Sequence, residues 1–270
     1  MDGDIAFIGG GNMASAIIHG MLQQGYPRDQ ITVVEPLEQT RDKLKAQFGI
    51  SAQQGANPSL ELAGTVVWAV KPQTFKEAAL QTCAYTLNAL HLSVAAGIPS
   101  NSIARWLSSE RVVRAMPNTP ALISKGITAL FARPSVSAAD QQHVEQIIRT
   151  TGEFLWVDTE TQLDAVTAIS GSGPAYVYYF MEAMTAAGAD MGLTREQAYR
   201  LTVSTFIGAA ELARSSNEPP EILRQRVTSK GGTTHAAIAT MDEAGVRPSF
   251  VRALHAARHR AHEMGQEFGD

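Results

Sequence analysis

A glycine-rich loop near the amino end is the first segment whose residues indicate chemistry. Gly9, Gly11 and Ala14 form a G-x-G-x-x-A pattern that follows the apolar run Ile5–Ile8 and begins a helical pattern. The first glycine permits a tight turn, the second lets the backbone approach a pyrophosphate, and the alanine lets the helix pack closely on a sheet. Free N–H groups at a helix start attract phosphate. The loop therefore predicts a dinucleotide site, with a glycine turn that binds nothing as the alternative.

The choice of dinucleotide depends on Glu35, which ends the second apolar run, Ile31–Val34. A carboxylate at this point would accept hydrogen bonds from the ribose 2′-hydroxyl of NAD and repel the 2′-phosphate of NADP. Arg41 and Lys43 follow on a helical pattern and could bind that phosphate, or could simply face solvent. The sequence leaves the choice open.

A second candidate site is the segment Ser229–Thr234, which contains two adjacent glycines. Such glycines let successive backbone N–H groups converge on an anion, and a helix beginning near Thr234 favours a carboxylate. The hydroxyl groups of Ser229 and Thr233 add donors. A plain helix N-cap is the alternative. His235, beside the segment, is a candidate proton donor, although sequence neighbours often point elsewhere.

Short apolar runs that alternate with helical patterns must position these segments. Runs that read as strands are Ile5–Ile8, Ile31–Val34, Thr65–Val70, Leu92–Ala95, Val112–Arg114, Thr128–Phe131 and Phe154–Val157. Continuous apolar strands separated by helices are typical of a parallel sheet that is covered on both faces. Right-handed crossovers then give an α/β fold with a Rossmann-type, doubly wound, mainly parallel sheet.

Strand patterns stop at about Leu163, and the remainder reads as helical. The expected helices are Pro174–Asp190, Thr194–Ser215 with Thr194 as its N-cap, a short one after Pro219 and Pro220, and Pro248–Met264. We expect a dinucleotide-binding domain in residues 1–160 and an all-helical dimerisation and substrate domain in residues 161–270. Helices this apolar need a partner surface, which a second copy of the chain could supply.

Composition excludes several classes of protein. The 270 residues are 44% hydrophobic and 18% charged, and the net charge is -4, so we expect a folded protein with no basic stripe for nucleic acid. Cys83 is the single cysteine, which excludes an intramolecular disulfide and a cysteine-based zinc site. Neither a signal peptide nor a membrane-spanning run is predicted, so we expect a cytoplasmic protein without a membrane partner.

Two further patterns resemble catalytic motifs without completing them. His255, His259 and His262 share a helix face, but arginines interleave and no H-E-x-x-H pattern is present, so we expect a solvated face and no metal. Ser170 and Ser172 lie among glycines but do not complete G-x-S-x-G, which argues against a hydrolase.

Five segments together resemble the pyrroline-5-carboxylate reductase family, and the likeness runs over nearly the whole chain. They are Phe7–Ala14, Ala69–Gln73, Arg114–Pro120, Ser170–Tyr176 and Val227–Thr234. One departure is Lys230, where the family often has proline. We expect little consequence, because backbone and hydroxyl groups would do the binding; alternatively, the lysine adds positive charge near an anionic substrate.

The resemblance implies hydride transfer from NAD(P)H to the C=N carbon of 1-pyrroline-5-carboxylate, giving L-proline in the last step of proline biosynthesis. Thr234 would be the catalytic residue, its hydroxyl orienting and polarising the ring nitrogen. A threonine hydroxyl is a poor general acid near neutral pH, so the proton is left to the iminium or a water. The substrate-binding residues implied are Ser229, Gly231, Gly232, Thr233 and Thr234.

The resemblance also implies a set of cofactor-binding residues for NADPH, with NADH possible. They are Gly9, Gly11, Asn12, Met13, Glu35, Asn57, Ala69, Val70, Lys71, Pro72, Ala95, Gly97, Met116 and Asn118. Lys71 is interpreted as a positioning or surface lysine rather than a catalytic one. Asn57 reaches the adenosine ribose or is an ordinary loop residue. The segments around Ala95 and Met116 are expected to line the nicotinamide pocket.

The family builds homodimers through its helical half and stacks them into rings, so we expect a homodimer at least. Resemblance further implies that each active site joins one chain's nucleotide domain to its partner's helical domain. Two rival functions stay open at this point: another two-domain dehydrogenase of the 3-hydroxyacid type, and a cofactor-binding protein without catalysis. The intact Ser229–Thr234 segment argues against the second rival.

Overall fold

The computed structural model describes residues 3–269, and contacts divide the chain into two units. The first unit contains residues up to Ser172 together with the carboxyl-terminal segment from Ala257, and the second is Gly173–Ala256. The boundary expected at residue 160 falls near the end of the last strand. By contacts, the first unit extends beyond it and also includes the end of the final helix.

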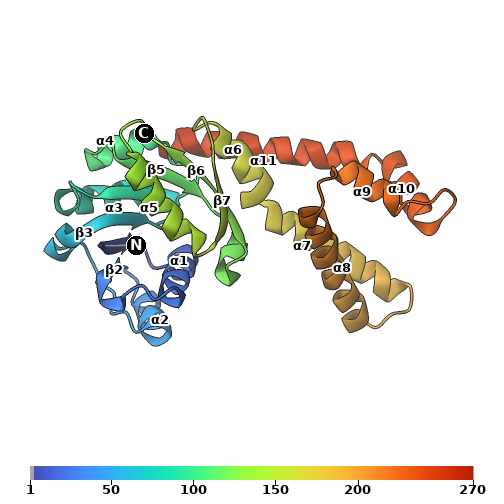
Figure 1. The fold of residues 1–270 in the computed structure, drawn as a ribbon, viewed down its shortest axis with the longest axis horizontal. Coiled ribbons are helices and arrows are strands. Elements are labelled where there is room, and N and C mark those ends of the chain that lie inside the picture. The colour runs from blue at the N-terminus through green and yellow to red at the C-terminus, as the bar shows by residue number, and fades with distance from the viewer. Residues whose placement is uncertain (1–2, 270) are drawn as a thin grey trace. The chain divides into compact units, whose positions relative to one another are not determined.

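The first unit is built on one seven-stranded sheet, in the order β2-β1-β3-β4-β5-β6-β7 (Figure 1). The strands are β1 Asp4–Ile8, β2 Ile31–Val34, β3 Ala63–Trp68, β4 Leu90–Ser93, β5 Val112–Met116, β6 Gly126–Ala132 and β7 Gly152–Trp156. Strands β1 to β5 are parallel, whereas β6 pairs antiparallel with β5, and β7 runs parallel to β6. The mainly parallel, Rossmann-type sheet predicted from the sequence is confirmed.

Helices cover both faces of this sheet, which explains why its strands read as continuous apolar runs. Along β1, Ile5 and Phe7 belong to one buried layer and Ala6 and Ile8 to the other. The first layer packs against α1 (Asn12–Gln23), α2 (Glu38–Phe48) and α5 (Ala138–Arg149). The second packs against α3 (Pro72–Thr82) and α4 (Ser100–Leu107).

Shorter helical turns complete the first unit. They are η1 Arg28–Gln30, η2 Pro58–Leu62, η3 Cys83–Tyr85, η4 Thr119–Ile123, α6 Gln162–Val166 and the π-helical turn η5 Thr167–Gly171. Turn η4 lies in the short link between β5 and β6. A link of this length cannot make the crossover that parallel strands require, so β6 reverses direction.

All the regular secondary structure described in the second unit is helical, as expected. It contains α7 Gly173–Asp190, α8 Arg195–Ser215, α9 Pro220–Arg226, α10 Thr233–Glu243 and the beginning of α11, Val246–Phe268. Thr194 caps α8 through a capping box with Gln197, which confirms the predicted N-cap. Helices α7 and α8 approach closely where Gly188 faces Ala198, since a Cβ at Gly188 would lie 2.7 Å from that of Ala198.

Candidate functional site

The glycine loop connects β1 to α1 and lies against the turn that follows β3. Gly9 has φ 94°, and its N–H donates to the carbonyl of Val34 (2.8 Å). A Cβ at Gly9 would lie 2.6 Å from the carbonyl oxygen of Ala69. Both the positive φ and the close approach therefore require glycine. Gly11, by contrast, is exposed and would meet no atom within 4 Å, so its missing side chain leaves the outer surface of the loop open.

Glu35 is turned inward beneath the glycine loop. Only 7% of this residue is exposed. Its Oε2 accepts the N–H of Gly10 at 2.8 Å, and its Oε1 accepts the N–H of Leu37 at 2.9 Å. The carboxylate thus links the glycine loop that follows β1 to the turn that follows β2. The cofactor-contacting role anticipated for Glu35 competes with this internal one.

Arg41 closes over the same corner from α2. Its Nη1 donates to the carbonyls of Glu35 (3.0 Å) and Pro36 (2.6 Å). The guanidinium group is therefore fixed at the end of β2 while most of its five N–H donors remain outside these two bonds. Lys43, the other cation suggested by the sequence, is exposed on the same helix.

Backbone hydrogen bonds join the carboxyl ends of β1, β3 and β4. The N–H of Ala69 donates to the Ile8 carbonyl (2.8 Å), and that of Val94 donates to the Trp68 carbonyl (3.0 Å). Lys71 is exposed at the N-cap of α3, and Pro72 is the first residue of that helix. Because the strands are parallel, these turns lie along one edge of the sheet, where ligands of such folds bind.

The two asparagines expected near the cofactor have structural partners. Asn57 Oδ1 accepts the N–H of Ser59 (2.9 Å), and its Nδ2 donates to Gln53 Oε1 (2.6 Å). Asn118 Oδ1 accepts the N–H of Ile127 (3.0 Å) and so helps to start β6. Each side chain therefore shapes the turn that contains it.

The remaining residues of the expected nicotinamide pocket follow β4 and end β5. Ala95 is buried, and its N–H donates to Ser93 Oγ (3.3 Å). A Cβ at Gly97 would meet Cβ of Met264 at 3.0 Å, so the end of α11 lies against this turn. Met116 is the last residue of β5 and is half-buried.

The segment Ser229–Thr234 forms a tight turn in the second unit. Gly231 has φ 76°, a left-handed conformation that favours glycine, and the N–H of Gly232 donates to the Ser229 carbonyl (3.0 Å). Helix α10 begins at Thr233, which leaves the first backbone N–H groups of this helix without intrahelical partners. Thr234 is half-buried in the first turn. The turn thus offers free backbone N–H groups at a helix start, the kind of donor that anions use in proteins.

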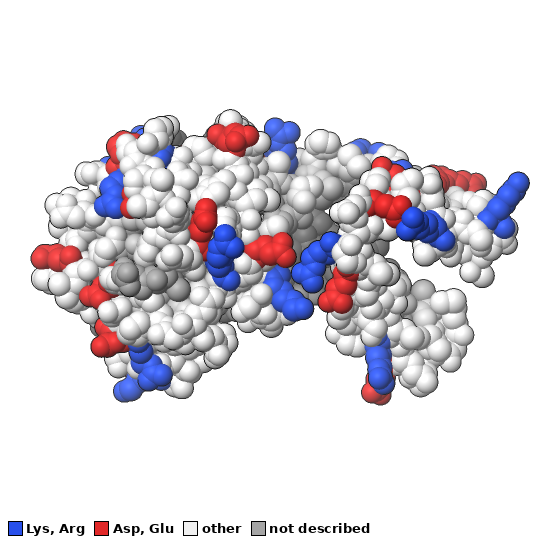
Figure 2. All heavy atoms as spheres, in the orientation of Figure 1, with Lys and Arg blue, Asp and Glu red and all other residues white. Residues whose placement is uncertain are grey.

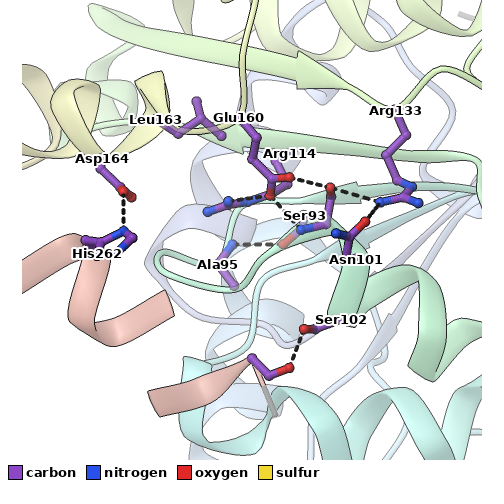
Figure 3. A network of polar contacts seen from close by, with 12 residues as sticks. Ser93, Ala95, Asn101, Ser102, Arg114, Arg133, Glu160, Leu163, Asp164 and His262 are labelled. Carbon is purple, nitrogen blue, oxygen red and sulfur yellow. Dashed lines mark hydrogen bonds and ion pairs between the residues drawn. The ribbon is translucent and has the colours of Figure 1, made fainter. Parts of the chain in front are cut away.

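A polar network around Glu160 was not anticipated from the sequence (Figure 3). Glu160 accepts hydrogen bonds from Ser100 N–H and Oγ, each at 2.6 Å, and from Arg114 Nη1 at 2.7 Å. Burial raises the pKa of Glu160, but the Arg114 charge and the Ser100 donors outweigh it and hold that pKa below its ordinary value. The network ties the start of α4 to β5, and its members are too far apart in sequence for any local pattern to reveal it.

The histidines of α11 do not gather into a metal site. His259 Nδ1 lies 3.3 Å from Glu263 Oε1, and His262 Nδ1 lies 3.4 Å from Asp164 Oδ2. Within residues 3–269, no group of three or more histidine, cysteine or acidic side chains is placed to hold a metal. In the same range, no helix has both the length and the apolar character needed to span a bilayer. Acidic and basic side chains are interspersed on the face shown in Figure 2.

Comparison with known proteins gives a consistent picture. A family model described as pyrroline-5-carboxylate reductase dimerisation matches residues 160–264, and one described as NADP oxidoreductase coenzyme F420-dependent matches residues 4–97. The chain is 46% identical over 268 residues to pyrroline-5-carboxylate reductase of Pseudomonas aeruginosa, covering 98% of each sequence. It is 40% identical over 266 residues to the Haemophilus influenzae enzyme, covering 96% of this chain and 97% of the relative.

Solved structures agree with these sequence relatives. A pyrroline-5-carboxylate reductase from Coxiella burnetii superposes with a TM-score of 0.89 at 38% identity, covering 97% of this chain and 98% of the other. Plasmodium falciparum pyrroline carboxylate reductase with NADP bound gives a TM-score of 0.88 at 26% identity, covering 98% of both chains.

Proposed function

The chain belongs to the pyrroline-5-carboxylate reductase family, and from this premise we propose that it reduces 1-pyrroline-5-carboxylate to L-proline, the last step of proline biosynthesis, with NADPH as the reductant. The observation that carries the proposal is the Ser229–Thr234 turn, whose geometry at the start of α10 suits an anion, in a chain that also has a dinucleotide-type glycine loop. The bound nicotinamide supplies the hydride, and the protein supplies binding, orientation and a suitable electrostatic environment.

The glycine loop fits a dinucleotide pyrophosphate. Gly11 is the N-cap of α1, so the N–H groups of Asn12, Met13 and Ala14 have no carbonyl partner within the helix. The space outside Gly11 is open, and the helix dipole adds positive potential there. The N–H of Gly10 is already bonded to Glu35 and takes no part. The loop and the first turn of α1 would therefore hold the phosphates.

The end of β2, where Glu35 and Arg41 lie, fits NADPH, because the Glu35 carboxylate is bonded to the protein's own backbone. Glu35 spends both oxygens on backbone N–H groups, which lowers its repulsion of a 2′-phosphate. Arg41 is fixed beside it and would place guanidinium donors on that phosphate. NADH stays an open alternative, because each Glu35 oxygen accepts only one backbone N–H and has a second lone pair. That lone pair could accept the ribose 2′-hydroxyl of NADH. The ratio of rates with the two cofactors decides the matter.

The substrate carboxylate would lie on the Ser229–Thr234 turn. The first N–H groups of α10 and the nearby hydroxyls supply donors, and Lys230 adds a positive charge close by. The Thr234 hydroxyl would hydrogen-bond the ring nitrogen and fix the angle at which the hydride arrives. The proton on that nitrogen comes with the iminium or from a water.

The assembly we propose is a homodimer formed through the second unit, with rings of dimers as a further step. Support comes from the match of residues 160–264 to a dimerisation family and from large apolar side chains exposed on α7 and α8. Each catalytic centre would combine the glycine loop of one chain with the Ser229–Thr234 turn of its partner. Dilution into monomers should therefore abolish turnover. We place the enzyme in the cytoplasm, where NADPH is available.

The proposal is tested by following NADPH absorbance in the presence of the purified chain and 1-pyrroline-5-carboxylate, and then by repeating the assay with NADH. We expect oxidation that requires the substrate and yields proline. A folded oligomer that oxidises neither cofactor when substrate is added would overturn the proposed function.

A further inference from the structure

The π-helical turn η5 (Thr167–Gly171) separates α6 from α7 and is held by its own side chains. The N–H of Ser172 donates to the Thr167 carbonyl (2.8 Å), five residues back. The hydroxyls of Thr167 and Ser170 donate to the carbonyls of Leu163 (2.8 Å) and Val166 (3.1 Å). Single π turns are rare, and they occur frequently at functional sites.

The turn presents bare backbone to the end of the sheet. A Cβ built on Gly171 would lie 2.5 Å from Cε of Met116, closer than real Cβ contacts come. The next nearest atoms belong to Thr167 in the same turn, at 3.8 Å. The Met116 methyl group therefore rests directly on the glycine, and a larger residue at position 171 would displace it. Because Cε is the far end of a flexible side chain, this displacement should cost little stability while it moves the methyl group.

Met116 is not an ordinary core residue. It is the last residue of β5 and lies at the carboxyl ends of the parallel strands, where the turns after β1, β3 and β4 also lie. It is half-buried, whereas Ala115 before it is 3% exposed. This is the position expected for one wall of the nicotinamide pocket. A displaced Met116 side chain would change the shape of that wall.

We propose that Gly171 is a positioning residue for hydride transfer: by having no side chain, it seats Met116 in the conformation that shapes the nicotinamide pocket. The inference rests on the proposed function in one respect, namely that Met116 lines this pocket. The π turn contributes by placing position 171, rather than a neighbouring residue, against the end of β5.

The chain offers a matched control in Gly173. A Cβ there would meet nothing within 4 Å, and this glycine is the next one along the same helical segment. Alanine raises helix propensity at both positions, so a general effect on helix stability would occur in both variants. Only Gly171→Ala adds a methyl group against Met116.

The experiment measures kcat, the KM for NADPH, and NADPH binding to the substrate-free enzyme through the fluorescence of the cofactor. We expect Gly171→Ala to lower kcat/KM by about three- to tenfold and to weaken NADPH binding, because a displaced Met116 methyl group changes the fit of the nicotinamide. Gly173→Ala should stay within about twofold of wild type. Thermal unfolding of the cofactor-free variants shows whether either has lost its fold.

A double-mutant cycle with Met116→Ala identifies the cause of any loss. If Met116 transmits the effect, Gly171→Ala should cause no further loss in the Met116→Ala background. The inference is overturned if Gly171→Ala behaves like Gly173→Ala, or if its full effect persists without the Met116 side chain, even in a variant that unfolds earlier. Because NADPH binding is read without substrate, a failure of the proposed reaction would leave this test intact.

Discussion

The two units of the chain complete their structures in different ways. In the first, strand residues such as Phe7, Val67 and Trp68 are fully buried between helices of the same chain. In the second, α7 buries only Thr185 and Gly188 among its described residues, and the helices leave large apolar groups exposed. The glycine loop therefore stands on a core that one chain completes, whereas the Ser229–Thr234 turn belongs to a unit whose helices leave much apolar surface uncovered.

The substitution that should distinguish the roles of the two units most clearly is Thr234→Ala. If the Thr234 hydroxyl orients the imine as proposed, its loss should lower kcat by about a hundred- to a thousandfold, whereas NADPH binding to the first unit should be unchanged. Steady-state kinetics and cofactor fluorescence measure the two effects. Thr240→Ala is the control on the same helix, since the Thr240 hydroxyl only bonds the Ala236 carbonyl (3.0 Å). Equal activity of the two variants would remove Thr234 from the reaction.

A buried histidine in the first unit should make the free energy of unfolding depend on pH. His91 is fully buried beside Trp68, and burial together with the Arg111 charge lowers the pKa of His91 to about 4 from 6.5. Between these values the unfolded chain binds more protons than the folded one. Stability should therefore fall as pH drops through this window, by about 3 kcal/mol in total.

Urea unfolding at pH 7 and pH 4, followed by tryptophan fluorescence, measures this loss of stability. His91→Gln keeps an acceptor near Trp68 and should remove most of the difference between the two pH values. His19→Gln changes an exposed histidine and serves as the control. An undiminished pH dependence in His91→Gln would assign the effect to other groups.

The exposed apolar side chains of the two units should contribute differently to association between copies of the chain. Tyr179 on α7 is 70% exposed and Leu62 in the first unit is 73% exposed within a single chain. If the second unit is the dimer surface, Tyr179→Asp should weaken association by about 2 kcal/mol, because it places a charge in a dry interface. Leu62→Asp should leave the oligomer intact. Light scattering over a dilution series distinguishes the two, and the reverse result would move the interface to the first unit.

The smallest effect is expected from Glu35→Gln. The amide replaces one carboxylate oxygen by a donor, so one of the two backbone N–H partners is lost, at a cost of about 1–2 kcal/mol in unfolding free energy. We also expect weaker NADPH binding, since the glycine loop is less well held. Glu38→Gln, an exposed neighbour, is the control. If Glu35→Gln instead improves NADPH binding without a loss of stability, its carboxylate acts on the cofactor and not on the loop.

Local patterns predicted most of the fold. Apolar runs placed the strands, Thr194 marked the start of α8, and the spacing of Gly9 and Gly11 located the strand–loop–helix unit. The reversal at β6 was missed, because it depends on the length of the link that contains η4 and not on the composition of the strand.

The interior of the candidate site was much less predictable. The inward turn of Glu35, the bonds from Ser100 to Glu160 and the contact of Gly171 with Met116 all join residues distant in sequence. Hydrophobic periodicity and glycine spacing carry no information about such pairs. Residue type identified Glu35 as important, but only its two backbone partners indicate what the carboxylate does.

The most direct test of the central claim follows the hydride itself. Incubation with 1-pyrroline-5-carboxylate and NADPH that carries deuterium at both C4 positions of the nicotinamide should give proline with one deuterium on the carbon that was doubly bonded to nitrogen, as read by mass spectrometry. Unlabelled proline, or no proline while NADPH is consumed, would contradict the account.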